Sequence, residues 1–216
     1  GAMYKNKFVG TFGDFACFSF YPTKILGTYG DGGFIITKKF NDYKKVKRLR
    51  FYGIETTDKK NKFFNKYYAN DNGFNSRLDE IQSSILNIKL KYIDNFIDKR
   101  RQLANLYFKN LKETKLKLPI VNNYSKHVYH LFTVSHPKKN KIVRLLKNKK
   151  IGTRVIYPYP INKMKVYSKF NSKNNNLKKT NDKSKEIFSL PLYPELKISE
   201  VNRISKIIKD ILKKIH

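Results

Sequence analysis

Cysteine is almost missing from this sequence, because Cys17 is the only one among 216 residues. A single cysteine cannot form a disulfide within the chain, and it excludes a metal site built from several cysteines. We therefore expect no bound metal and a protein of a reducing compartment.

Long apolar runs are missing as well. No uninterrupted stretch approaches the roughly 20 apolar residues that a membrane-spanning helix needs. The first residues, GAMYKNKFVG, lack both the charged start and the apolar centre of a secretion signal. We expect a cytoplasmic protein without a membrane partner, and its 40% hydrophobic content is enough to bury a core.

Acidic residues are scarce: 16 Asp and Glu face 47 Lys and Arg, for a formal net charge of +31. Such a balance suggests a polyanionic partner. However, only eight of the basic residues are arginine, and the abundant Lys, Asn, Ile, Tyr and Phe share A/T-rich codons. The lysines are also spread along the chain, so a solvated basic surface is favoured over a dedicated nucleic-acid site, with a basic polyanion-binding protein kept as an alternative.

Hydrophobic periodicity predicts an α/β succession. Alternating apolar residues indicate strands, three- to four-residue spacing indicates helices, and polar runs indicate loops. The expected strands are 15–20, 33–38 and 127–134, and residues 152–160 are expected to be a strand that runs into a proline-rich turn. The expected helices are 41–50, 76 to about 111, 141–149 and 199–215. The expected loops are 53–73, a long functional loop, and 168–185, a mobile loop of low complexity.

The predicted helix that begins at residue 76 has the clearest signals. Ser76 is placed to cap it, with Asp79 three residues later, and acidic residues favour the positive start of a helix. Apolar residues then recur on one face to about Leu111, which predicts one long helix or a broken pair.

Lys24 stands between an apolar strand and a glycine-rich loop in ACFSFYPTKILGTYGDGGFIIT, residues 16–37. A phosphate-binding P-loop is excluded because Ile25 follows the lysine, and a dinucleotide fingerprint is excluded because Ile35 stands where its last glycine belongs. A lysine amine can form a Schiff base with a carbonyl compound or with pyridoxal phosphate when partial burial favours its neutral form. Ser19, at the strand end, could bind a cofactor phosphate, but this spacing alone favours Lys24 as an ordinary exposed loop lysine.

Five ordered segments resemble the DegT/DnrJ/EryC1/StrS family of pyridoxal-phosphate-dependent nucleotide-sugar aminotransferases. They are GDFACFSFYPTKILGTYGDGGFIIT, GFNSRLDEIQSSIL, HVYHLFTV, IGTRVIYPYPI and FSLPLYPEL, and together they cover nearly the whole chain. The resemblance implies that Lys24 forms the Schiff base with the cofactor and then moves protons. It also implies that Ser19 binds the cofactor phosphate, that Asn75 reaches the partner's cofactor phosphate in a homodimer, and that Tyr21 and Tyr157 face the sugar.

The same resemblance implies a fold-type-I architecture, in which residues 1–97 are the carboxy-terminal part of the PLP-binding large domain and residues 98–216 are a smaller α/β domain. The implied reaction transfers an amino group from L-glutamate to a keto sugar on a nucleoside diphosphate. A dehydratase of this family is less consistent with the sequence, because such enzymes replace the lysine with histidine.

Two departures from the family pattern matter. Ile156 and Asn162 stand where histidines are usual. No counterpart of the upstream half of the cofactor domain is recognised, including the aspartate that pairs with the pyridine nitrogen. We therefore expect a carboxy-terminal fragment, and a catalytically inactive fragment or relative remains an alternative.

Overall fold

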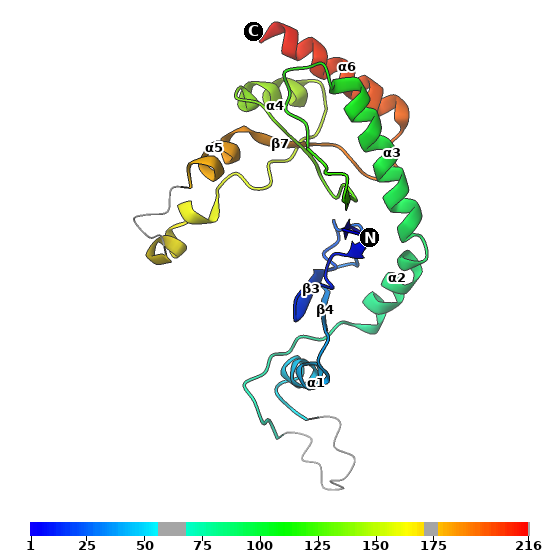
Figure 1. The fold of residues 1–216 in the computed structure, drawn as a ribbon, viewed down its shortest axis with the longest axis vertical. Helices are drawn as coiled ribbons and strands as arrows, with labels where there is room; N and C mark the ends of the chain where they lie inside the picture. The colour runs from blue at the N-terminus through cyan, green and yellow to red at the C-terminus, as the bar shows by residue number, and fades with distance from the viewer. Residues whose placement is uncertain (56–67, 171–176, 216) are drawn as a thin grey trace. The chain divides into compact units, whose positions relative to one another are not determined.

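The computed structural model describes residues 1–55, 68–170 and 177–215. The chain divides into two units, Gly1–Asp94 and Asn95–His216. Figure 1 colours the chain from blue at the amino end to red at the carboxyl end.

Two antiparallel strand pairs open the first unit. Strand β1 (Met3–Tyr4) pairs with β2 (Lys7–Phe8), and β3 (Phe15–Ser19) pairs with β4 (Gly33–Thr37). The β3–β4 register joins Phe15 to Thr37 and Ser19 to Gly33. Alternation predicted β3 and a short β-rich run predicted β4, and the structure confirms both strands.

Three helices follow: α1 (Phe40–Leu49), α2 (Glu80–Leu90) and α3 (Ile93–Leu111). The long helical pattern is therefore a broken pair. The predicted cap at Ser76 is wrong, because α2 starts after Asp79, whose backbone N–H donates to Gln82 Oε1 at 3.2 Å. Ser76 lies three residues before Asp79, and its backbone N–H donates to the carbonyl oxygen of Arg50 at 2.9 Å.

Apolar side chains of the first unit are mostly exposed. Within its described residues, Ile54 and Leu86 are the only apolar side chains that are buried. Both faces of the β3–β4 pair present aromatic or aliphatic groups to solvent, including Phe15, Phe18 and Ile35. The buried core of the chain therefore lies in the second unit.

The second unit packs helices on a short sheet. Strand β6 (Phe132–Ser135) pairs antiparallel with β7 (Ile187–Leu190), and helices α4 (Lys139–Asn148) and α6 (Ile198–Lys214) lie against each other. The remaining elements are β5 (Ser125–Lys126), the 3₁₀ helices η1 (Ile161–Lys163) and η2 (Lys165–Phe170), and helix α5 (Lys178–Glu186). None of the described helices combines the length and the apolar composition that crossing a bilayer would require.

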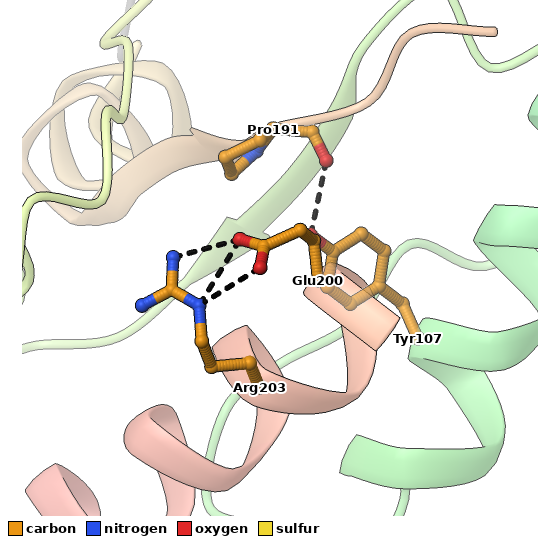
Figure 2. A network of polar contacts seen from close by, with 4 residues as sticks. All are labelled: Tyr107, Pro191, Glu200 and Arg203. Carbon is orange, nitrogen blue, oxygen red and sulfur yellow. Dashed lines mark hydrogen bonds and ion pairs between the residues drawn. The ribbon is translucent and has the colours of Figure 1, made fainter. Parts of the chain in front are cut away.

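Tyr107 lies at the centre of this core. Its ring is fully buried, and the ring centre lies 5.1 Å from that of Phe132, on which it stacks. Its hydroxyl donates to the carbonyl oxygen of Pro191 at 3.0 Å (Figure 2). Burial raises the pKa of the Tyr107 phenol well above its ordinary value. An Arg203–Glu200 ion pair of 2.8 Å on α6 is exposed by comparison.

Three predicted segments differ from the structure. The strand predicted before the proline-rich turn in 152–160 does not form, because Arg154 makes only an isolated bridge to Ser189. The strand predicted over 127–134 begins only at Phe132, because Tyr129 has a left-handed φ of 49°. Part of the predicted polar loop is helix α5, a segment without glycine or proline. Residues 171–176 of that loop, and 56–67 of the loop predicted over 53–73, lie outside the described residues.

Candidate functional site

Lys24 lies on a tight connection between β3 and β4. Its backbone N–H donates to the carbonyl oxygen of Tyr21 at 2.8 Å, which closes a turn. The N–H of Thr28 donates to Phe20 O at 2.8 Å, and the N–H of Phe20 donates to Gly32 O at 2.7 Å. These bonds fold the loop back onto the strand ends, so the half-buried Lys24 side chain projects from a braced backbone.

Gly27 is needed for this fold of the loop. A Cβ atom at this position would lie 2.6 Å from the carbonyl oxygen of Pro22 and 2.7 Å from that of Tyr21. These backbone oxygens cannot shift without distorting the loop, so any larger residue would displace the Lys24 turn.

Helix α2 supports the second half of the loop. Gln82 Nε2 donates to the carbonyl oxygens of Tyr29 at 2.8 Å and Asp31 at 2.9 Å, and Thr28 Oγ1 donates to Gln82 O at 3.4 Å. Lys89 Nζ also donates to the carbonyl oxygen of Gly27. Sequence reasoning missed Gln82 and Lys89. The Asp79–Gln82 spacing of a capping box was a visible signal for Gln82, but it did not indicate the loop contacts.

Ser19 and Tyr21 lie on the same connection as Lys24. Ser19 ends β3 and is exposed, and its Oγ accepts the backbone N–H of Tyr21 at 3.2 Å. A serine hydroxyl that accepts one bond can still donate its hydrogen to another oxygen. Tyr21 is 51% exposed, so its ring is open to a ligand as well.

The segment around Asn75 lies along the end of α1. Asn75 forms an antiparallel bridge with Phe51, the N–H of Phe74 donates to Leu49 O at 2.7 Å, and the N–H of Tyr52 donates to Phe74 O at 3.0 Å. The backbone of Asn75 is thus fixed while its side chain is exposed. In the part of the chain that the structure describes, no hydrogen bond joins Asn75 to Ser19 or Lys24.

Gly73 permits this close approach of the two segments. A Cβ atom on Gly73 would lie 2.0 Å from the backbone nitrogen of Gly53. Only a residue without a side chain fits there, so Gly73 holds the Asn75 segment against the residues after α1.

Tyr157 belongs to the second unit and is 73% exposed. Ile156 precedes it, and Asn162 Nδ2 donates to Asn181 Oδ1 at 3.1 Å. The structure thus brings Ser19, Tyr21 and Lys24 together in one loop, and it places Asn75 and Tyr157 in other segments.

Comparison with characterised proteins extends this description. The chain is 34% identical over 217 residues to a dTDP-3-amino-3,4,6-trideoxy-alpha-D-glucose transaminase of Micromonospora megalomicea subsp. nigra, with 98% of this chain and 56% of the relative covered. The crystal structure of S. venezuelae DesV in complex with a ketimine intermediate superposes with a TM-score of 0.90 at 29% identity, covering 100% of this chain and 56% of that one.

A third comparison concerns the cofactor. The structure of NtdA from Bacillus subtilis with bound cofactor PMP matches with a TM-score of 0.82 at 26% identity, covering 95% of this chain and 47% of that chain. The chain therefore spans about half the length of these relatives. Residues 1–209 match the DegT/DnrJ/EryC1/StrS aminotransferase family. With its mixed α/β structure and these matches, the chain belongs to the DegT/DnrJ/EryC1/StrS aminotransferase family.

Proposed function

We propose that this chain carries part of a pyridoxal-phosphate-dependent aminotransferase that moves an amino group from L-glutamate to a keto sugar linked to a nucleoside diphosphate. The observation that carries the proposal is the braced loop with Lys24 at its turn and Ser19 at the preceding strand end. The family membership and the nucleotide-sugar transaminase relatives support the choice of substrate class.

The residues of this loop fit two ends of the cofactor. The primary amine of Lys24 suits the aldehyde, and the exposed Ser19 hydroxyl has a hydrogen to donate to the phosphate. When bound, pyridoxal phosphate would supply an electron sink for the carbon that carries the amino group. Asn75 would provide a further phosphate contact from the partner of a homodimer.

The protein's own contribution is position and proton movement. The Tyr21–Lys24 turn and the Gln82 contacts fix the backbone of the loop from which the Lys24 side chain projects. The amine of Lys24 would act as the base that takes a proton from the carbon bearing the amino group, and then as the acid that gives the proton back. Over the two halves of the reaction, the C–N bond of glutamate is broken and a C–N bond to the sugar is formed, leaving a 2-keto acid. Tyr21 and Tyr157 would orient the sugar.

The two units of the chain would correspond to two domains of such an enzyme. Residues 1–97 would be the carboxy-terminal part of the PLP-binding large domain, and residues 98–216 would be the small domain. The sparse burial in the first unit supports this, because the exposed apolar groups of β3 and β4 are typical of strands that are covered in a larger sheet.

The test is chemical and uses the longest polypeptide that the gene encodes. The protein is incubated with pyridoxal phosphate, reduced with borohydride and mapped by peptide mass spectrometry. We expect the adduct on Lys24, with amino transfer from glutamate to a nucleotide-linked keto sugar.

Lys24→Ala and Lys24→Arg should lose both the adduct and the transfer, whereas Lys45→Ala, at an exposed position of α1, should keep both. An adduct on another lysine, or full transfer by Lys24→Ala, would falsify the proposed role. An adduct on Lys24 without transfer would instead favour an inactive relative.

A further inference from the structure

A basic hollow lies beside the Asn75 segment, within the first unit. It has a volume of about 170 Å³, and among the described residues it is lined by Lys47, Arg50, Phe51 and Arg77. This volume is several times the roughly 30 Å³ that one water molecule takes in liquid water, so the hollow has room for a small polyatomic group.

Two sequence-distant segments build this hollow. Lys47 and Arg50 are three residues apart at the end of α1, which places them on one side of the helix. The bridge between Phe51 and Asn75 then brings the second segment alongside. Arg77, two residues beyond Asn75, places its guanidinium carbon 5.6 Å from the centre of the Phe51 ring. Three cations therefore surround one opening.

Among the described residues, no acidic side chain forms an ion pair with the cations of this hollow. Arg48, on the same helix, forms ion pairs with Glu55 at 3.2 Å and with Asp71. Over the described ranges, by contrast, no carboxylate forms an ion pair with Lys47, Arg50 or Arg77. Gathering three unpaired cations costs electrostatic free energy, and a bound anion would recover it.

We propose that this hollow binds the diphosphate group of a nucleotide. Two guanidinium groups offer planar pairs of donors that match phosphate oxygens, and the lysine adds a third positive charge. A diphosphate carries its negative charge on two linked phosphate groups. It can therefore contact three separate cations better than a single phosphate can. A nucleic acid binds along an extended row of basic residues that follows its phosphate backbone, and the four residues that line this hollow do not form such a row.

The identity of the natural ligand rests on the proposed function, in which the diphosphate would be that of the nucleotide-linked sugar. The hollow shares its second segment with Asn75. A dimer that delivers Asn75 to the partner's cofactor would therefore deliver Arg77 to the partner's substrate.

Binding can be tested without cofactor or turnover. Thymidine diphosphate and inorganic pyrophosphate are titrated into the 216-residue chain by calorimetry at near-physiological salt, with orthophosphate and a single-stranded oligodeoxynucleotide as comparisons. We expect both diphosphates to bind more tightly than orthophosphate. Loss of one charge-assisted contact should weaken thymidine diphosphate binding about tenfold in Arg50→Gln and in Arg77→Gln.

Lys45→Gln is the matched control, since it removes one positive charge from the exposed side of the same helix, away from the hollow. It should change the affinity less than about twofold, as expected for a distant, screened charge. Circular dichroism confirms that each variant keeps its helices, which is expected because Arg50 and Arg77 are exposed.

Three results would overturn the inference: unchanged affinity in both arginine variants, equal weakening by Lys45→Gln, or an oligonucleotide that binds more tightly than thymidine diphosphate and depends on the same arginines. The adduct on Lys24 is measured separately. A result that overturns diphosphate binding by the hollow can therefore be distinguished from a result that overturns the proposed aminotransferase function.

Discussion

The side-chain amide nitrogen of Gln82 lies 2.9 Å from the carbonyl oxygen of Asp31, to which it donates a hydrogen bond across 51 positions of sequence. The same nitrogen donates to Tyr29 O, so one side chain of α2 binds two carbonyl groups of the loop that contains Lys24. This contact makes the position of the loop depend on the helix.

Gln82→Glu should loosen that loop. Glutamate has the same length but no N–H donors, so both carbonyls would lose their partner, at a cost of about 1 kcal/mol in the free energy of unfolding. Hydrogen exchange followed by mass spectrometry should show faster exchange over residues 28–32 than in the unaltered chain. Asn87→Ala, at an exposed site on the same helix, is the control. Equal exchange in Gln82→Glu and the control would show that the bonds do not restrain the loop.

Asn75→Ala should weaken cofactor binding more than it lowers stability. The backbone of Asn75 forms the bridge to Phe51, whereas its side chain is exposed, so alanine preserves the local fold. The measurements are the thermal midpoint and the dissociation constant for pyridoxal phosphate of the longest gene product. Asn72→Ala, also exposed, should alter neither. If both quantities fall together in Asn75→Ala, the side chain is structural.

Arg100 should be a strong determinant of stability in the second unit. It is 6% exposed, and its Nη1 donates to the carbonyl oxygens of Tyr129 at 3.1 Å, His130 at 3.3 Å and Leu192 at 2.9 Å. Arg100→Met keeps most of the volume but removes the donors, which should lower the free energy of unfolding by about 3 kcal/mol in urea titrations. Lys99→Met, at the exposed neighbouring position, should have little effect. Comparable losses in the two variants would rule out this role.

His127 should make stability pH-dependent. Partial loss of solvent lowers the pKa of its imidazole, and the positive charge of Arg101 lowers it further. Its Nδ1 also accepts the backbone N–H of Tyr129 at 2.8 Å, a bond that a proton on Nδ1 would break. The unfolded chain then binds this proton more readily, so stability falls as the pH drops below about 6.5 toward the lower folded pKa.

The contribution of His127 to this pH dependence is measured from the free energies of unfolding at pH 7.5 and 5.5, in the unaltered chain and in His127→Gln. We expect a smaller difference between the two conditions in His127→Gln than in the unaltered chain. An identical pH dependence in both proteins would assign the effect to other groups.

Local patterns in the sequence determined many of the elements. Alternation predicted β3, a short β-rich run predicted β4, and three- to four-residue spacing predicted α1, α4 and α6, because strands and helices place side chains on one face with different periods. The family resemblance was likewise carried by contiguous motifs, and it already singled out Lys24, Ser19 and Asn75. Their roles stay predictions.

Contacts between distant segments were decided only by the tertiary structure. The backbone of Ser76 is bound to Arg50, and the Lys24 loop is braced because Gln82 and Lys89 reach it across the fold. The hollow around Phe51 exists only because Asn75 pairs with it. A hydrogen bond needs its two atoms within about 3 Å, and the fold of the intervening chain sets that separation, so no local pattern of residues reports it.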